Sequence, residues 1–517
     1  MSSYTLDEAL DQFGIGRFQY FVIAVGGLAY VADSMEIMVL SFLGPIMKCK
    51  YDITPEEESV MATVVFIGMC LGALVCGALS DRLGRKLGAI VTGVLVSIGG
   101  VLSAVVNSFG AILVARFIVG VGMGGVPVAY SWVMEFVPAK KRGRVGVIVQ
   151  SFWTMGAIFQ VTVSWFTLNT IGYRWMLIIT AMPIFVLLGM FFCVPESIRY
   201  LLAKGRYDRA NRLLRHMARV NKMQLPQGNL KVIKENSDEF EPMSSKVKAI
   251  CNNSYRHDTI MLMIVWISNA AIYYGVVLLT TELIQMNDEQ AVTPKVNSTN
   301  RRMLLQQNAV ESADLQCSHL FTEQEFGELF LSALSETPGM LLTYFFVDRI
   351  GRKKTQTLLF SIVTICFTVL YVIDDQGLTT AVLAIVRACI LGTFTVVYIY
   401  TPERYDTKIR STAMGILVAG SRLGSMVSPF ISVDLPEHGY ARTSFLIYGI
   451  MSIVALLASL SLKLETKGLS MDNVEDESRA VEMQSRVFKQ GSSDSNGASV
   501  ANIGLQFHPL KDDELGQ

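Results

Sequence analysis

The sequence DRLGRK at residues 81–86 returns as DRIGRKK at residues 348–354, a separation of 267 positions, and this repetition decides the fold. Two further residues return in the same order, each 268 positions later: Glu135 returns as Glu403, and Arg142 returns as Arg410. Because several elements recur in order at nearly one separation, the sequence indicates a duplicated chain whose two halves fold alike.

The composition is that of a membrane protein. The 517 residues are 51% hydrophobic and 17% charged, with a mean hydropathy of +0.42, whereas soluble chains carry about 25% charged residues. Lys+Arg and Asp+Glu both total 44, so net charge gives no reason to expect a nucleic-acid partner. Eight cysteines are too sparse for a disulfide framework. The acidic first residues, with Asp7, Glu8 and Asp11, do not resemble a cleaved signal peptide.

Apolar runs of about 20 residues predict helices that cross a bilayer, because backbone polar groups cannot stay unpaired in lipid. Twelve runs meet this criterion: 18–44, 59–79, 87–106, 110–133, 145–168, 174–194, 259–283, 326–347, 355–373, 379–401, 411–433 and 443–463. The predicted fold class is therefore an all-α membrane protein with 12 transmembrane helices in two six-helix halves.

The predicted domains follow from the same pattern: a segment 1–17, a bundle 18–194, a linker 195–258, a second bundle 259–463 and a tail 464–517. The linker contains RYDRANRLLRHMARV, whose apolar residues recur at helical spacing and predict amphipathic helices. Such helices either pack under the bundle or bind a partner or lipid headgroups. The tail is polar and is expected to be disordered.

Lysine and arginine in the short loops predict the orientation, because cytoplasmic loops carry an excess of them. One side holds 14 such residues and the other holds seven. We assign the first side, with both motif stretches and both termini, to the cytoplasm. The loop 285–325 then lies on the other side, where Asn297 begins an N-glycosylation sequon. Cys49 and Cys317 lie there too, and we expect them unbonded because a disulfide would tie two moving halves together.

The repeated loops combine an aspartate, a turn glycine and several basic residues, so that ion pairs can form and break between helix ends. Surface pairs contribute only about 0–1 kcal/mol each, which suits a protein with two conformations of similar energy. Alternatively, these charges only set the topology. The candidate gating residues are Asp81, Arg82, Gly84, Arg85, Lys86, Arg116, Glu135, Arg142, Asp348, Arg349, Gly351, Arg352, Lys353, Arg387, Glu403 and Arg410.

The repeated motif, PESIRYLL at Pro195 and LETKG at Leu464 resemble signatures of sugar porters and organic-ion transporters of the major facilitator superfamily. Ile198 and Leu464 depart from the usual prolines. Longer stretches, including ADSMEIMVLSFLGP at Ala32 and SNAAIYYGVVLLTTEL at Ser268, are similar to the synaptic vesicle 2-related proteins and to nicotinate transporters. The resemblance covers residues 4 to 468 and implies the major facilitator fold without fixing a substrate.

Charged side chains inside predicted spans cost about 3 kcal/mol or more and therefore mark functional positions. Asp33 and Glu36 share one face of the first span. Other polar residues fall at a similar depth, where transporter sites lie between the halves. The candidate substrate-binding residues are Arg422, Asp33, Glu36, Glu336, Asn269, Tyr273 and Tyr274.

Arg422 is assigned to a substrate carboxylate, because its planar guanidinium matches that group. The resemblance agrees, since SRLGSMVSPF is similar to the organic-anion branch, whereas cation-selective relatives tend to carry an aspartate here. The alternative is an ion pair of Arg422 with Glu336 or a first-span carboxylate. Asp33, Glu36 and Glu336 either carry protons or serve helix packing. Tyr273 and Tyr274 either stack on an aromatic substrate or pack.

The sequence thus predicts alternating-access transport of a small organic monocarboxylate, nicotinate-like, with protons as the candidate coupling ion. Two alternatives stay open: an organic cation carrier that uses Asp33 and Glu36, and a vesicle protein that binds ligands or partners without transport. GVGMGG at Gly120 lacks a surrounding βαβ unit, and no P-loop or HExxH is present, so we expect no enzyme, no cofactor and no metal. We expect a monomer in the plasma membrane or a vesicle membrane.

Overall fold

The computed structural model describes residues 3–138, 141–230, 243–292, 321–373, 375–405 and 407–467. Its first half contains β1 (Ser3–Tyr4), α1 (Leu6–Phe13), α2 (Arg17–Tyr51), α3 (Pro55–Leu83), α4 (Arg85–Val105), α5 (Phe109–Met123), α6 (Val126–Met134), α7 (Arg142–Leu168) and α8 (Tyr173–Cys193). The linker contains α9 (Ile198–Ala203), α10 (Tyr207–Asn221), β2 (Asn229–Leu230) and α11 (Met243–Ile250).

The second half contains α12 (Asn253–Val292), α15 (Glu323–Leu334), α16 (Glu336–Arg349), α17 (Arg352–Val372), α18 (Gln376–Arg404), α19 (Thr407–Pro429), the π-helical turn η3 (Phe430–Asp434), α20 (Leu435–Glu437) and α21 (Ala441–Ser461). Within the described ranges, 12 helical stretches are long and apolar enough to cross a membrane. All 12 coincide with the predicted spans, and the all-α membrane fold is confirmed.

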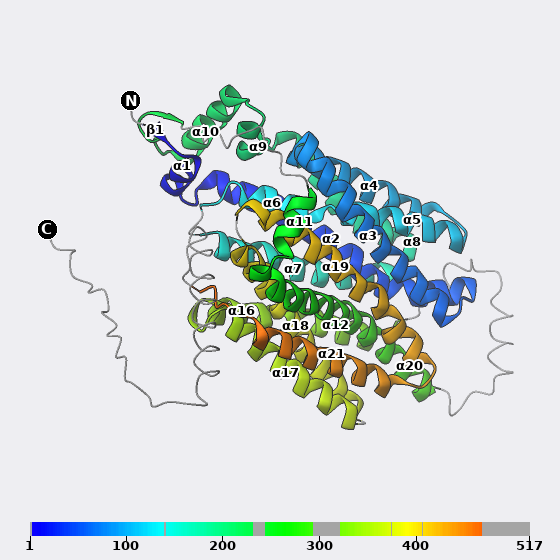
Figure 1. The fold of residues 1–517 in the computed structure, drawn as a ribbon. Helices are drawn as coiled ribbons and strands as arrows, with labels where there is room; N and C mark the ends of the chain where they lie inside the picture. Colours follow the sequence, from blue (N-terminus) through cyan, green and yellow to red (C-terminus); the bar gives the residue numbers. More distant parts are fainter. Residues whose placement is uncertain are drawn as a thin grey trace, which may run out of the picture.

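The spans form two groups of six, one from α2 to α8 and one from α12 to α21, which lie one above the other in Figure 1. Inside the first group α2 packs on α7 and α3 on α5, and inside the second α12 packs on α19 and α17 on α21. The groups meet mainly along two helix pairs, α3 with α19 and α7 with the interrupted span α15–α16, and α2 also contacts α12. The predicted two halves are therefore present.

Several helices extend beyond the apolar runs that predicted them. The first span reaches Tyr51 instead of residue 44, and α12 begins at Asn253 instead of 259. Capping boxes stabilise two of the polar first turns, at Thr54 with Glu57 and at Thr322 with Glu325. In each box the side chain of the threonine and that of the glutamate three residues later accept a hydrogen bond from the other residue's backbone N–H. The apolar pattern marks only the membrane-embedded part of each helix.

Helix α10 of the linker packs against the start of α2, as its amphipathic pattern predicts. Its apolar face is buried, although Tyr207 at its first turn is 39% exposed. The Phe18 N–H donates to Asn221 Oδ1 at 3.0 Å, and Asn221 Nδ2 donates to Gln19 Oε1 at 2.8 Å. The linker is thus attached to the first span by specific hydrogen bonds.

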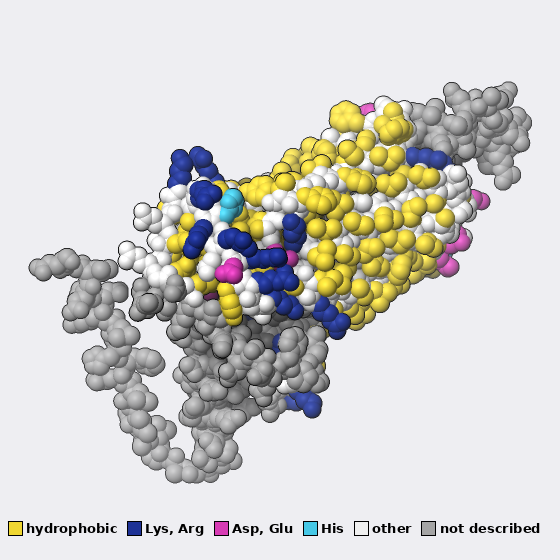
Figure 2. All heavy atoms as spheres, turned by 90° about the horizontal axis from the view of Figure 1, so that it is seen from above, with side chains coloured by type: hydrophobic (Ala, Val, Ile, Leu, Met, Phe, Trp, Pro, Cys, Tyr) yellow, Lys and Arg dark blue, Asp and Glu magenta, His cyan; other side chains and the backbone are white. Residues whose placement is uncertain are grey.

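Lysine and arginine gather at one end of the molecule, beyond a broad hydrophobic belt (Figure 2). We call this end, which carries the repeated loops, the basic end. Cys49 lies at the opposite end and is disulfide-bonded, so the expectation of a free thiol there is wrong. The expectation rested on relative movement of the two halves, which a bond at one helix end need not prevent. Cys317 and Asn297 lie outside the described residues.

Candidate functional site

Glu36 of α2 forms a buried ion pair with Arg116 of α5. The Arg116 Nη1 atom lies 2.9 Å from Glu36 Oε2, and both side chains are 1% exposed. Arg116 Nε also donates to the Ser103 hydroxyl at 2.9 Å. The other carboxylate oxygen, Glu36 Oε1, is buried without a hydrogen-bond partner. Glu36 is therefore neutralised within the first half, with one oxygen free to accept a further bond.

Glu336, in the eighth span, forms the interior carboxylate–arginine pair of the second half. It begins α16, where the eighth span is interrupted, and Arg387 Nε of α18 lies 2.8 Å from its Oε1 atom. The Tyr273 hydroxyl donates to the same oxygen at 3.0 Å, while Glu336 Oε2 has no partner. Trp153 Nε1 of α7 in turn donates to the Tyr273 hydroxyl. This hydrogen bond connects the two halves at the centre of the molecule.

Arg116 and Arg387 were expected among the gating residues, but the structure places them in these interior pairs. Each lies closer to the beginning of its span than to the end that reaches the basic loops, and each is 1% exposed. The repeat identified the two arginines as equivalent, whereas their depth depends on the direction in which the fourth and tenth spans run. They belong to the central site and not to the loops.

Arg422 of α19 is buried without a carboxylate partner. Its Nη1 atom donates to the Tyr274 hydroxyl at 3.0 Å, its Nε atom has no hydrogen-bond partner, and the side chain is 6% exposed. Asp33 of α2 lies within electrostatic range, yet among the described residues the two form no direct ion pair. The alternative of an ion pair between Arg422 and Glu336 or a first-span carboxylate is not seen among the described residues, where Glu336 binds Arg387 and Glu36 binds Arg116.

Aromatic rings of α12 surround this arginine. The Tyr274 ring centroid lies 5.0 Å from Phe66 of α3 and 5.4 Å from Tyr273. Asn269, one turn earlier on α12, accepts a hydrogen bond from the Thr393 hydroxyl at 2.5 Å, and its Nδ2 atom is buried without a partner. Both halves thus supply aromatic surface next to a cation and an unsatisfied amide.

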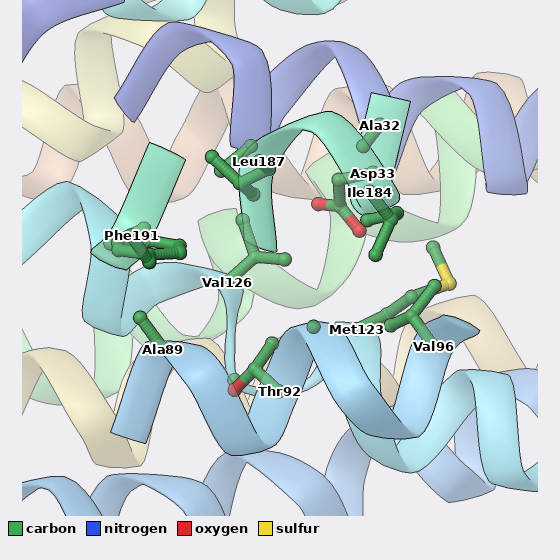
Figure 3. A pocket seen from close by; sticks show the side chains of 14 residues that line it. Ala32, Asp33, Ala89, Thr92, Val96, Met123, Val126, Ile184, Leu187 and Phe191 are labelled. Atoms are coloured by element: carbon green, nitrogen blue, oxygen red, sulfur yellow. The ribbon is translucent and has the colours of Figure 1, made fainter. Parts of the chain in front are cut away.

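Asp33 lies in a separate apolar pocket inside the first half, between α2, α4, the α5–α6 junction and α8. Figure 3 shows its carboxyl group among Ile184, Met123 and Val96. The side chain is 7% exposed, and Oδ1 has no hydrogen-bond partner. The structure therefore separates Asp33 from the ion-paired Glu36, although sequence spacing placed both on one helical face.

The first repeated loop is held inside the first half. Gly84 has φ +112°, a conformation that favours glycine. Arg85 Nε lies 3.3 Å from Glu135 Oε1, just beyond the end of α6. Burial raises the pKa of Glu135 to about 7, against the lowering effect of Arg85 and Arg199. The Lys86 N–H donates to Glu196 Oε1 at 3.2 Å.

The second repeated loop repeats this arrangement inside the second half. Gly351 has φ +100°. Arg352 donates from Nε and Nη2 to the two oxygens of Glu403, both at 3.1 Å, and from Nη1 it pairs with Asp348 at 3.2 Å. Glu465 accepts the N–H groups of Arg352 and Lys353 at 2.7 and 3.1 Å.

Other candidate gating residues occupy equivalent positions in the two halves. Arg142 Nε donates to the Val137 carbonyl at 3.3 Å, and Arg410 Nε donates to the Tyr405 carbonyl at 3.2 Å. Arg82 is exposed, and Arg349 lies over the Phe345 ring at 6.0 Å. The side chain of Asp81 lies outside the described residues. The ion pairs of Arg85 and Arg352 thus connect helix ends within one half and do not cross between the halves.

Glu196 and Glu465 are site residues that sequence reasoning missed. Each carboxylate accepts a backbone N–H from the first turn of the helix after the repeated loop. The next residue in each case donates its hydroxyl to the glutamate that pairs with the loop arginine, Ser197 to Glu135 and Thr466 to Glu403. The signal that could have located them is a Glu-Ser dipeptide in the first half and a Glu-Thr dipeptide in the second, which lie 269 positions apart and so nearly match the repeat.

At the end opposite the basic end, polar contacts close the seam between the halves. The Ser59 hydroxyl of α3 donates to the Pro429 carbonyl at 3.2 Å, and the Thr63 hydroxyl donates to the Met426 carbonyl at 3.0 Å. Lys48 of α2 forms an ion pair with Glu437 of α20. On the other helix pair, Trp165 of α7 donates to Glu323 at 2.5 Å.

Comparison with known proteins places this arrangement among membrane transporters. Residues 20–293 match the family described as sugar (and other) transporter, and residues 319–499 match the major facilitator superfamily. The chain is 34% identical to the synaptic vesicle 2-related protein of Rattus norvegicus over 98% of this chain and 88% of that protein. It is 33% identical to the organic cation/carnitine transporter 7 of Arabidopsis thaliana over 90% of this chain and 95% of that protein.

Solved structures show a similar fold at low sequence identity. The proton:xylose symporter XylE bound to 6-bromo-6-deoxy-D-glucose superposes with a TM-score of 0.63 at 19% identity, covering 89% of this chain and 98% of that chain. The inward open conformation of the xylose transporter XylE from E. coli gives a TM-score of 0.64 at 16% identity, covering 89% of this chain and 99% of that chain.

Proposed function

This chain belongs to the major facilitator superfamily, in the branch of the synaptic vesicle 2-related proteins, and we propose that it carries a small organic anion. Its family makes it a membrane transporter of small organic substrates and not an enzyme. The substrate is a monocarboxylate, nicotinate-like in charge and size, and Arg422 binds its carboxylate. The observation that carries this proposal is the buried Arg422 guanidinium, which forms no ion pair with any described residue and whose Nε atom has no hydrogen-bond partner.

A buried guanidinium that makes no direct ion pair is unfavourable, because desolvation removes its water while Asp33 acts on it only at a distance. A substrate carboxylate supplies a direct counter-charge and uses the free Nε–H as one donor of a two-point contact. Tyr274 already holds the guanidinium at Nη1 and fixes its orientation. The rings of Tyr274 and Phe66 then offer apolar surface to a flat organic body.

Coupling to protons is the second part of the proposal. Glu36 and Glu336 each bind an arginine with one oxygen and keep the other oxygen, Oε1 or Oε2, free. Protonation would weaken the ion pair to Arg116 or Arg387 and change which helices are held together. Glu336 is the stronger candidate, because Tyr273 and Trp153 extend its hydrogen bonds to the other half.

We further propose that the basic end faces the cytoplasm, that both termini lie there, and that the protein works as a monomer in the plasma membrane or a vesicle membrane. The excess of lysine and arginine at this end supports the orientation. The ion pairs of Arg85 and Arg352 keep each half rigid while the halves rock. Their role is therefore to make each six-helix unit move as one body.

The test is uptake of labelled nicotinate, driven by a pH gradient, into proteoliposomes that contain wild type, Arg422→Ala or Arg422→Lys. We expect Arg422→Ala to lose uptake by about a hundredfold, because truncating one partner of a buried charge pair costs about 2–5 kcal/mol. Arg422→Lys keeps the charge without the planar fork and should fall between the two. Arg209→Ala, an exposed arginine of α10, is the matched control. Normal uptake by Arg422→Ala would disprove the anion site.

A second candidate function is organic cation transport through Asp33. Its support is the apolar pocket in which the Asp33 Oδ1 atom has no hydrogen-bond partner, since such a pocket fits an apolar body with a cationic head. Competition separates the two functions: organic cations should inhibit uptake in the cation case and organic anions in the anion case. Asp33→Asn should abolish cation uptake while leaving a site built on Arg422 able to bind anions.

A further inference from the structure

Three glutamates from three helices meet at the seam opposite the basic end. Glu58 lies in the first turns of α3, Glu282 near the end of α12 and Glu437 at the end of α20. One carboxylate oxygen of each lies within 4.8 Å of the other two. The cluster joins the halves, because α3 belongs to the first half and the other two helices to the second.

Glu58 is the member that indicates a ligand. Its side chain is 6% exposed, its Oε2 atom is buried, and it makes no hydrogen bond within the described structure. A carboxylate buried in this way needs a proton or a cation to offset its lost hydration. One of its carboxylate oxygens lies within 4.8 Å of a carboxylate oxygen of both Glu282 and Glu437.

Lys48 is the basic side chain that the structure places beside this cluster, where it pairs with Glu437. A divalent cation carries twice the charge of this ammonium and can bind several carboxylates at once. The Lys48 side chain is 41% exposed, so it can turn into solvent when a cation takes its place.

We propose that Glu58, Glu282 and Glu437 form a binding site for a hard divalent cation of the Ca²⁺ class that bridges the two halves. Carboxylate oxygens without nitrogen or sulfur ligands favour such cations. One carboxylate oxygen of each glutamate lies within 4.8 Å of the other two, close enough for one ion at about 2.4 Å from each oxygen to bind all three. Water molecules complete the coordination at this end of the protein.

Binding has a conformational consequence, because the ligands come from both halves. Ser59 and Thr63 of α3 bond carbonyl groups of α19 directly beside Glu58. A cation held by Glu58 and Glu437 adds to these contacts and stabilises the conformation whose seam is closed at this end. A ligand that binds one state better shifts the equilibrium toward that state.

The test is calorimetric titration of Ca²⁺ into the purified full chain at neutral pH. We expect one Ca²⁺ per chain for wild type and at least tenfold weaker binding for Glu58→Gln, which keeps the shape and removes the charge. Glu56→Gln is the matched control, because Glu56 lies in the same first turn of α3 and is exposed. Transport of any substrate is not needed for this readout, so its failure does not affect the proposed function.

Lys48→Met provides a second, opposite result. Removal of the competing ammonium should tighten Ca²⁺ binding on the order of tenfold, given the charge of the ion and screening near the surface. A site that serves only helix packing would not gain affinity in this variant. Absence of Ca²⁺ binding to wild type, or equal binding by Glu58→Gln, would overturn the proposal.

Discussion

The two repeated loops of the molecule have nearly the same sequence but differ in how tightly they are held. In the second half, Arg352 binds both oxygens of Glu403, and Glu465 accepts two N–H groups at the start of α17. In the first half, Arg85 approaches one oxygen of Glu135 at 3.3 Å. One motif thus pairs with a glutamate in both halves, by two nitrogens at 3.1 Å in the second half and at a longer distance of 3.3 Å in the first.

The difference lies in the chain segment that supplies the glutamate to each loop. Glu196 precedes Ser197 and α9, which continue into the linker, and it accepts the N–H of Lys86 and that of Ser197. Glu465 stands after the last span, and both its oxygens reach the first turn of α17. Duplicated sequence therefore determines which residues meet, whereas the neighbouring chain decides how many hydrogen bonds they complete.

The largest expected effect comes from removing the loop arginines one at a time. Arg352→Met should cost about 2 kcal/mol of stability, because it leaves Glu403 without its two-point partner. Arg85→Met should cost about 1 kcal/mol, since the pair is longer and Arg85 is 25% exposed. Thermal unfolding of the purified variants in detergent measures both.

Equal losses in the two halves would contradict this ranking, and a larger loss for Arg85→Met would reverse it. Exposed Arg209→Met on α10 is the control for a general effect of removing an arginine, and it should leave the unfolding temperature unchanged.

A smaller effect is expected from the glutamates that contact the helix starts. Glu465→Gln removes a negative charge from the first turn of α17 and weakens two hydrogen bonds, which should cost about 1 kcal/mol. Glu196→Gln weakens one such bond to α4 and should cost less. Hydrogen exchange of the first turns of α4 and α17 provides the measurement, and faster exchange in α4 of Glu196→Gln than in α17 of Glu465→Gln would refute the ordering.

The sequence predicted the spans and the equivalence of the halves because both leave periodic signals along the chain. Apolar runs located the 12 membrane helices of the described residues, and the repeat identified Glu135 and Glu403, like the two loop motifs, as equivalent in the two halves; the structure adds that Arg85 pairs with Glu135 and Arg352 with Glu403. These residues lie just beyond the ends of their spans, and the direction in which each span crosses the membrane is enough to bring them to the same end of the molecule. No pattern of that kind identifies partners inside the membrane.

Interior partners depend on how each helix is rotated about its axis. Asp33 and Glu36 are three residues apart, yet one lies in an apolar pocket and the other binds Arg116 from another span. A rotation of a few tens of degrees would exchange these surroundings. The interior charges could therefore be identified from the sequence, but not that Arg116 and Arg387, both candidate gating residues, pair with Glu36 and Glu336.

The smallest effect concerns pH, and it tests the first-half loop directly. Burial raises the pKa of Glu135 to about 7, whereas glutamate in an unfolded chain titrates near ~4.3. Between these values the folded protein holds the extra proton, so this stabilising contribution is present at low pH and is lost as the pH rises through 7.

Glu135 is ionised only above that range, and only then does Arg85 gain a full ion pair. The loss of unfolding temperature in Arg85→Met should therefore be smaller at pH 6 than at pH 8. In a Glu135→Gln background the loss should not depend on pH, and an equal loss at both pH values without that substitution would show that Glu135 stays charged throughout.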